Sequence, residues 1–325
     1  MKKWMKTIAA MMTITMAMTG CGGGSDASAD DAAGKYTVGI VQQLEHPALD
    51  AATLGFQEKL TELLDGNVTF DYQNAQGEQT NCTTIATKFV SDGVDLIMAN
   101  ATTALQSAAA ATADIPIVGT SVTDYVTAGV VDSNEAPGRN VTGASDLAPI
   151  DEQIAMLTEL VPDAQKVGIV YCSAEPNSMY QSKLAQAELD EANIAWAEYT
   201  AADSNEVQSV VTKAVAECDV LYVPTDNTMA NNTEIIKNVA VPAGVPVIAG
   251  EEGICSGCGV ATLSISYYDL GVKAAEMAYE ILVNGANPAE MPIEYVSEGI
   301  TEKYNAEIAE ALQIAIPEDM VAIGE

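Results

Sequence analysis

Polar side chains gather directly after apolar runs in this sequence, at positions where they could contact a small ligand. The candidates are Glu45, His46, Thr102, Thr103, Thr120, Ser121, Asp226, Asn227 and Glu251. A helix start with free N–H groups, as expected at Thr102 and Thr103, suits a carboxylate. Asp226 and the Glu251–Glu252 pair could oppose an ammonium group. Together these groups favour a zwitterion, such as an amino acid, as the ligand.

Some of these residues have a simpler structural explanation. Thr102 and Thr228 each stand where a helix is expected to begin, so their hydroxyls could cap it instead. Tyrosines could add a stacking surface for a ligand. Five stand in or near the expected loops: Tyr125, Tyr171, Tyr222, Tyr267 and Tyr268. Tyr222 falls within a strand run and is interpreted as core, whereas Tyr268 is kept as a candidate ligand contact.

Catalytic chemistry finds little support in the sequence. Glu45 beside His46 could form an acid–base pair. His46 is the only histidine, however, and it directly precedes an expected helix, where capping or ligand binding is a simpler role. The sequence has neither a Gly-Lys-Ser phosphate loop nor a Gly-x-Ser-x-Gly elbow. We therefore expect a protein that is not an enzyme and that uses no cofactor and no metal.

Cys255 and Cys258 are spaced as in redox and zinc motifs. A redox pair needs its first cysteine at a helix start, but glycines flank this pair and a strand pattern follows. Zinc needs about four ligands, and no second pair or neighbouring histidine is present. A small disulfide and two reduced thiols remain open, with the disulfide favoured outside the cytoplasm. Three further cysteines are interpreted as small buried residues: Cys82, Cys172 and Cys218.

The first 35 residues have the pattern of an export signal and a tether. Three lysines within residues 1–6 precede an uncharged run at 7–18, and Thr19-Gly20-Cys21 follows. Such a run is too short to span a bilayer, which takes about 20 apolar residues, and the whole is typical of a signal peptide. The ending at Cys21 resembles the lipobox of bacterial lipoproteins, which implies acylation of Cys21 after removal of residues 1–20. Residues 21–35 then form a flexible tether rich in Gly, Ser, Ala and Asp.

The charge of the chain limits its partners. The formal net charge is −33, and no basic stripe is present, so nucleic-acid binding is disfavoured. The same field repels anionic lipid headgroups, so the lipid at Cys21 would be the only membrane attachment. No later run of 18 apolar residues occurs. The body of the protein is therefore expected on the outer face of the cell membrane, held there by its anchor.

The remaining 290 or so residues alternate between strand and helix patterns. Short runs rich in Val and Ile, bounded by turn residues, indicate buried parallel strands. These runs are 37–41, 68–72, 94–99, 115–119, 167–171, 220–223 and 245–249. Amphipathic helical patterns lie between them, as at 49–63. The alternation predicts an open α/β fold.

The strand runs also repeat, which indicates two lobes. Three tetrapeptides recur in the same order at offsets of 129, 124 and 130 residues, beginning at Val38, Val94 and Ile115 and again at Val167, Cys218 and Val245. Two α/β lobes side by side leave a cleft, and open α/β sheets bind ligands beyond the carboxyl ends of their strands. We therefore expect a ligand cleft between two Rossmann-like lobes.

Several blocks of residues resemble one family. They are Glu45–Asp50, Asp71–Gly77, Lys88–Asp92, Pro224–Thr228, Ala261–Leu263 and Tyr267–Gly271. These blocks look like those of the substrate-binding lipoproteins of ABC transporters that are typified by binders of tryptophan and other aromatic amino acids. The resemblance runs from about Lys35 to the C-terminus.

The resemblance implies a type I periplasmic-binding-protein fold in which the chain crosses between lobes three times. Lobe one would comprise 36–164 plus 268–290, and lobe two 165–267 plus 291–325. It further implies a monomer that closes on its ligand and delivers it to an ABC permease with its ATPase. A sensory receptor of the same fold, coupled to a membrane signalling protein, is the alternative that the sequence leaves open.

Overall fold

The strands of the first sheet come from the N-terminal half of the chain and from one late segment. The computed structural model describes residues 35–296 and 300–324, and within them the first sheet runs in the order β11-β5-β4-β3-β1-β2 with every neighbouring pair parallel. Its strands are β1 (Tyr36–Gln42), β2 (Val68–Asn74), β3 (Leu96–Asn100), β4 (Ile117–Val122), β5 (Val141–Ser145) and β11 (Glu294–Tyr295). The central strands β3, β4 and β5 are buried throughout, as expected for a sheet covered on both faces.

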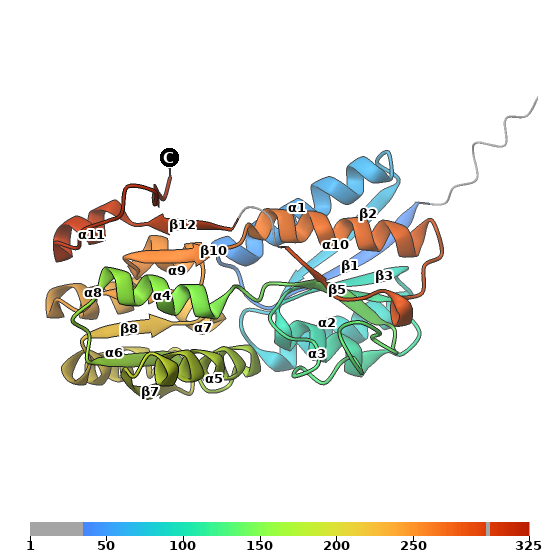
Figure 1. The fold of residues 1–325 in the computed structure, drawn as a ribbon. Coiled ribbons are helices and arrows are strands. Elements are labelled where there is room, and N and C mark those ends of the chain that lie inside the picture. Colours follow the sequence, from blue (N-terminus) through green and yellow to red (C-terminus); the bar gives the residue numbers. More distant parts are fainter. Residues whose placement is uncertain (1–34, 297–299, 325) are drawn as a thin grey trace, which may run out of the picture. The chain divides into compact units, whose positions relative to one another are not determined.

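Four helices pack against this sheet: α1 (Pro47–Leu63), α2 (Gln79–Asp92), α3 (Thr102–Ala111) and α10 (Tyr267–Leu282). Residues of α1 and α10 form one apolar core with the sheet, and residues of α2 and α3 form another. Helices α1 and α10 lie side by side although they are far apart in the sequence (Figure 1). Gly271 permits this close crossing, because a Cβ there would collide with the carbonyl oxygen of Ala52. We call this sheet with its four helices the first lobe.

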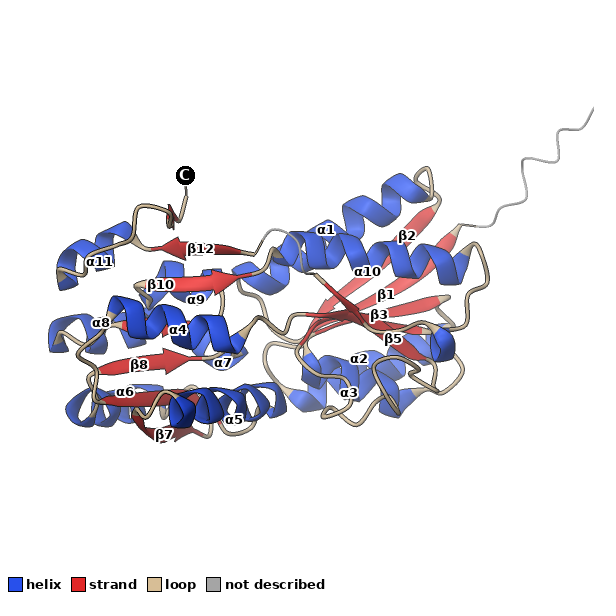
Figure 2. Cartoon of the chain, in the orientation of Figure 1, coloured by secondary structure: helices blue, strands red, loops and turns tan. Residues whose placement is uncertain are grey.

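The second sheet has the order β13-β12-β10-β9-β8-β6-β7 within the described residues, and it is parallel except between β10 and β12. Its strands are β6 (Lys166–Cys172), β7 (Ala195–Ala201), β8 (Val220–Val223), β9 (Val247–Ala249), β10 (Ala261–Ser264), β12 (Thr301–Tyr304) and β13 (Val321–Ala322). Its helices are α4 (Ile150–Leu160), α5 (Pro176–Glu191), α6 (Val207–Glu217), α7 (Asn227–Ala230), α8 (Thr233–Ala243), α9 (Glu252–Cys258) and α11 (Ala306–Leu312). Figure 2 shows helices flanking the strands of both sheets. We call this sheet with these helices the second lobe.

The chain passes between the sheets at three places. Residues 146–149 join β5 to α4, residues 265–266 join β10 to α10, and the third passage lies between β11 and β12 and includes residues outside those described. A short 3-10 turn, η1 (Pro288–Glu290), precedes β11. The α/β fold with two parallel-rich sheets confirms the expected fold class.

The sheet pairing differs from the expected lobe boundaries at two places. Helix α4 was expected in lobe one, but Ile154 and Leu157 pack into the core of the second lobe. Gln153 of α4 also binds the second sheet, because its side chain receives a hydrogen bond from Tyr222 and donates one to the carbonyl of Leu263. Conversely, β11 was expected in lobe two, but its backbone pairs with β5 of the first sheet. Short segments beside a crossing carry too little pattern of their own to reveal which sheet they join.

No helix within the described part of the chain is both long and apolar enough to cross a membrane. The expected signal peptide, Cys21 and nearly all of the tether lie outside the described residues.

Candidate functional site

A small polar cavity lies where loops of the two lobes meet. The first lobe contributes His46, Leu49, Ser121 and Asp146, and Tyr267 stands at the start of α10; the second lobe contributes Asn177, Thr225, Asp226, Asn227, Ala230 and Glu251. No lysine or arginine is among these described lining residues. The free volume is about 10 Å³, roughly the room for one water. An organic ligand therefore requires the lobes to part or the lining side chains to move.

The only histidine joins the two lobes directly. His46 precedes α1, and its Nε2 lies 3.1 Å from Oδ1 of Asn227, at the start of α7. The Asn227 amide nitrogen donates to Glu175, so its oxygen faces His46 and the imidazole must donate through Nε2. Burial lowers the pKa of His46, which favours the neutral ring. The Nδ1 atom is then an acceptor, buried and without a partner.

Glu175 holds the start of α7 in place. Its carboxylate accepts from the backbone N–H and the side-chain amide of Asn227, and from the N–H and hydroxyl of Thr228. Asn177 donates to the same carboxylate and to the carbonyl of Thr225. Asn177 also lines the cavity, and its Oδ1 atom is buried without a partner among the described residues. The second lobe therefore presents an unfilled acceptor close to the unfilled acceptor of His46.

Asp226 combines a structural and an electrostatic role. Its carboxylate caps α7 by accepting from the N–H of Met229 at 2.8 Å, and it also accepts from the N–H of Cys172 at 2.7 Å. The side chain is 1% exposed. Burial first, and then the nearby charge of Glu175, raise the pKa of Asp226. A ligand cation would offset both of these costs.

A second acidic group lies where β5 and β9 end. Asp146 accepts from the hydroxyls of Thr123 and Tyr267, each at 3.0 Å. Burial raises the pKa of Asp146 to about 6. Glu251 caps α9 through the N–H groups of Gly253 and Ile254, and burial, with a smaller contribution from Asp146, raises its pKa to about 7. A ligand group that carries positive charge or donates hydrogen bonds would favour the charged forms of both carboxyl groups.

Ser121 supplies a hydroxyl from the end of β4. Its backbone has a φ of 56°, a left-handed conformation that costs energy for any residue with a side chain. The Oγ atom is buried and has no partner among the described residues. Strain together with an unused hydroxyl in a cavity favours a role in ligand binding over one in folding.

The structure brings together five of the ten expected ligand residues. These are His46, Ser121, Asp226, Asn227 and Glu251. Thr102 and Thr120 are buried with unpartnered hydroxyls but do not line this cavity. Thr103 lies in a neighbouring groove that includes Glu175 and Thr228. Thr102 is the first residue of α3, and its side chain makes no cap contact, so the expected cap is not formed.

Glu45 and Tyr268 do not line the cavity. Glu45 is exposed. The burial of Tyr72 and, next, the charge of Glu45 raise the pKa of Tyr72 to about 12. Tyr268 is 38% exposed and donates from its hydroxyl to Glu58 at 2.7 Å. It borders a separate groove, of about 550 Å³, that shares Ala230, Glu251 and Tyr267 with the cavity.

Four polar lining residues were not predicted from the sequence: Asp146, Asn177, Thr225 and Tyr267. Asp146 follows β5, a strand whose sequence Val-Thr-Gly-Ala-Ser lacks a strong apolar run. Asn177 and Thr225 are uncharged and carry no local signal for a ligand contact. Tyr267 was considered with four other tyrosines, and its hydrogen bond to Asp146, 121 positions away, could not be inferred from sequence.

The disulfide expectation at Cys255 and Cys258 is wrong in this structure. Both residues lie on α9, are buried, and are free thiols, as are Cys82, Cys172 and Cys218. The Cys258 thiol donates to the carbonyl of Ile254 instead. Burial raises the pKa of both thiols. The flanking glycines suggested a loop, but the carboxylate of Glu251 caps a short helix there.

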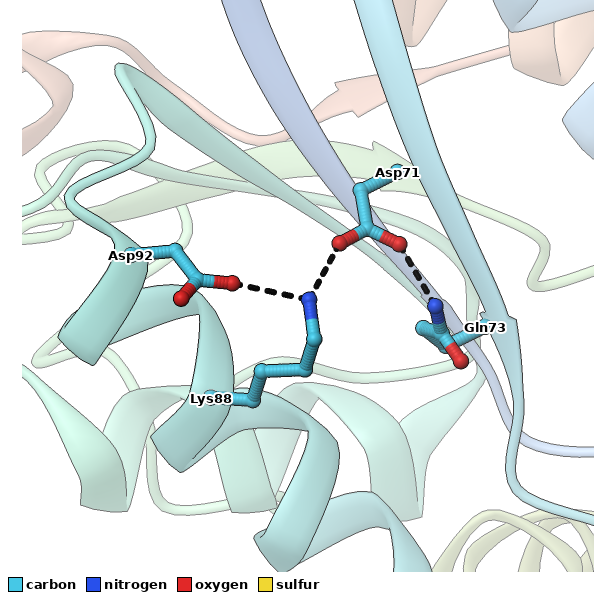
Figure 3. A network of polar contacts seen from close by, with 4 residues as sticks. All are labelled: Asp71, Gln73, Lys88 and Asp92. Atoms are coloured by element: carbon cyan, nitrogen blue, oxygen red, sulfur yellow. Dashed lines mark hydrogen bonds and ion pairs between the residues drawn. The ribbon is translucent and has the colours of Figure 1, made fainter.

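Charged residues outside the cavity form ordinary surface networks. Lys88 binds Asp71 on β2 and, at 2.8 Å, Asp92 at the end of α2, while Gln73 donates to Asp71 (Figure 3). Every acid of this network has a partner and substantial solvent access. No group of three His, Cys, Asp or Glu side chains within residues 35–296 and 300–324 is arranged to hold a metal ion.

Two α/β lobes that meet around an enclosed polar cavity define a solute-binding protein of the type I periplasmic-binding-protein fold. The family model described as "ABC transporter substrate binding protein" matches residues 37–324. The chain belongs to this family. Membership confirms the resemblance noted in the sequence, and it supports the expectation of a binding protein rather than an enzyme.

Individual relatives narrow the class further. A protein named "Tyrosine-binding protein" from Clostridioides difficile (strain R20291) is 40% identical over 300 residues, which are 90% of this chain and 86% of the relative. An ABC domain from Streptococcus pneumonia solved in complex with L-Trp has a TM-score of 0.85 at 31% identity, covering 89% of this chain and 99% of that one. A ligand-free, open substrate-binding protein with adhesive properties from Clostridium difficile has a TM-score of 0.69 at 37% identity, with the same coverage.

Proposed function

We propose that this protein is the extracytoplasmic receptor of an ABC importer and that it captures an amino acid between its two lobes. Family membership supports the transport role, and relatives that are named for tyrosine or solved with L-Trp support the ligand class. The observation that carries the amino-acid assignment is the cavity itself, where buried acceptors and carboxylates stand with no lysine or arginine among the described lining residues. Buried acceptors without donors are costly, so the cavity favours a ligand rich in donors.

An ammonium group fits the acceptors around Asp226. Its three N–H bonds would go to Nδ1 of His46, Oδ1 of Asn177 and the Asp226 carboxylate. The first two of these acceptors have no partner among the described residues. The ligand carboxylate would then face the first lobe, where the Ser121 hydroxyl lines the cavity. Thr120 on β4 and Thr102 at the start of α3 have buried hydroxyls without a partner among the described residues, and these hydroxyls would extend this donor side. Thr103, Glu45 and Tyr268 remain predicted contacts of the expanded site.

Hinge closure over the ligand is part of the proposal. The chain resembles the L-Trp complex more closely in shape than the open, ligand-free protein, although the open protein is the more similar in sequence. That contrast supports a closed arrangement of the lobes. The small free volume of the cavity supports the complementary step, in which the lobes separate to admit a ligand.

The signal and anchor complete the proposed role. Residues 1–20 would be removed and Cys21 acylated, so that the tether at 21–35 holds the monomeric receptor within reach of its permease and ATPase. The sensory alternative is not favoured, since the matching family is that of ABC transporter substrate-binding proteins.

A binding screen tests the proposal. Thermal denaturation would be followed with each of the twenty L-amino acids, with sugars and with nucleosides, and hits would be measured by calorimetry. A ligand at 100 times its Kd should add about 2.7 kcal/mol of stability, which is readily seen as a higher Tm. Stabilisation by sugars or nucleosides alone would overturn the amino-acid assignment.

A further inference from the structure

The cavity has two separate acidic ends. At one end Asp226 interacts with Glu175, beside the unpartnered acceptors of His46 and Asn177. At the other end Asp146 interacts with Glu251, beside the Tyr267 hydroxyl. All four carboxyl side chains are at most 4% exposed, so neither end is relieved by solvent.

A single ammonium group serves only one of these ends. The Asp226 end has the unfilled acceptors and therefore suits the three donors of an α-ammonium group. Among the described residues, the carboxyl groups of the Asp146 end receive two hydroxyls, from Thr123 and Tyr267, and the N–H groups of α9. A carboxylate oxygen accepts more than one hydrogen bond, so this end retains capacity for a further donor. Glycine, alanine or phenylalanine would bring no second donor to it.

We propose that the Asp146–Glu251 end recognises a hydrogen-bond donor on the ligand's side chain, so that the site selects aromatic amino acids carrying an O–H or N–H group over phenylalanine. This inference rests on the proposed function, because it assumes that the α-ammonium group occupies the Asp226 end. Sites built to hydrogen-bond a ligand hydroxyl discriminate strongly against the analogue without it, by about 10⁴-fold or more in the strongest cases. One charge-assisted hydrogen bond gives a lower bound of about tenfold.

Tyr267 positions the selecting carboxylate. It is 7% exposed, stands at the junction of β10 and α10, and donates to Oδ2 of Asp146. Thr123 donates to Oδ1 and in turn accepts, at 3.3 Å, from Gln181 of the second lobe. Residues of both lobes thereby hold the Asp146 carboxylate in place. Asp146 is therefore positioned to accept from a ligand donor only when the lobes meet.

Calorimetry with matched ligand pairs tests the inference on the unmodified protein. Tyrosine against phenylalanine, and tryptophan against 1-methyltryptophan, differ in one donor each. We expect the ligand lacking the donor to bind at least about tenfold more weakly in the pair that the site accepts. Equal binding within both pairs would overturn the inference while leaving the amino-acid receptor intact. Tighter binding of lysine or ornithine than of any aromatic ligand would also overturn it, because the second end would then take a cation. If no amino acid bound, the proposed function would fail as well.

Variants at the acidic end provide a second test. Asp146→Asn and Tyr267→Phe should each reduce the ratio of tyrosine to phenylalanine affinity toward one. Tyr36→Phe is the matched control, since it removes a hydroxyl that donates to the carbonyl of Leu282 outside the cavity, and it should keep the ratio. A ratio that stays unchanged in folded Asp146→Asn protein would exclude Asp146 as the selecting group.

Discussion

The Nε2 atom of His46 lies 3.1 Å from the amide oxygen of Asn227 and thereby joins the start of α1 in the first lobe to the start of α7 in the second. Both side chains are more than nine-tenths buried. Because the two residues belong to different lobes, this hydrogen bond exists only while the lobes are together. It therefore links the closed arrangement to the geometry of the ligand cavity.

Replacing His46 should weaken ligand binding by loosening closure. His46→Ala leaves the Asn227 oxygen buried without a donor, which costs about 1–3 kcal/mol in the closed form. We expect an affinity at least about fivefold lower, mainly through faster dissociation, measured by calorimetry and stopped-flow fluorescence. Lys59→Ala, on the same helix but paired only with Glu62 at the surface, is the control. An unchanged dissociation rate in His46→Ala would show that the contact does not hold the lobes together.

Removal of the Asp226 carboxylate should weaken binding more strongly. Asp226→Ala removes the proposed partner of the ligand ammonium, and we expect at least a tenfold loss of affinity, the scale of one charge-assisted contact. Asp226→Asn separates the two roles of this residue, because an amide oxygen can still cap α7. Asp92→Asn, in the surface network of Lys88, controls for loss of one negative charge. If folded Asp226→Asn protein bound the ligand as well as the parent, Asp226 would be a cap and not a ligand contact.

The fold could be predicted because its signal is local and repeated. All seven runs became strands, since each carries several β-branched or aromatic residues between turn signals. The run at 68–72 forms the edge strand β2, which is mostly not buried. Strands β5 and β7 were missed because small and polar residues interrupt their patterns. The family and the two-lobed fold are confirmed, whereas the sides taken by α4 and β11 depend on tertiary packing and could not be read from local sequence.

The candidate site was predictable only in part, for a related reason. Strand ends identify which loops face the cleft, so His46, Ser121, Asp226, Asn227 and Glu251 were found. The partners of these residues are distant in sequence; His46 and Asn227 are 181 positions apart. Asp146 and Tyr267 are likewise joined by a hydrogen bond between residues distant in sequence. Neither residue has a local sequence pattern that predicts this bond. Direct contact with a ligand stays a prediction for every one of these residues.

The free cysteines make a prediction about thiol chemistry. In the native protein Cys255 and Cys258 should react very slowly with Ellman's reagent, because both are buried and burial raises their pKa values. Cys82, whose pKa burial raises to about 11, should have about 100-fold less thiolate than an ordinary cysteine. Unfolding in guanidinium without reductant should expose all five thiols at these positions, identified by alkylation and peptide mass mapping. Detection of only three, rising to five after reduction, would instead establish a disulfide at Cys255 and Cys258.

Glu251 makes a prediction about stability and pH. Its pKa is raised in the folded protein to about 7, against about 4.3 in an unfolded chain. Between these values the folded state binds more protons than the unfolded state, so this residue's contribution to stability falls as pH rises. The stability of the ligand-free parent relative to Glu251→Gln should therefore decrease from about pH 4 to pH 7, by about 4 kcal/mol at most. Chemical denaturation at several pH values measures this difference.

Glu307→Gln provides a control of opposite sign. A hydrogen bond from Lys237 lowers the pKa of Glu307, so the contribution of that carboxylate is present above its unfolded pKa and is lost in acid. The stability of the parent relative to Glu307→Gln should thus rise with pH over the acidic range, by less than for a buried group because Glu307 is exposed. If the Glu251→Gln comparison also rose with pH, the carboxylate of Glu251 would be stabilised in its charged form. Burial would then not be the dominant influence on Glu251 at the Asp146–Glu251 end of the cavity.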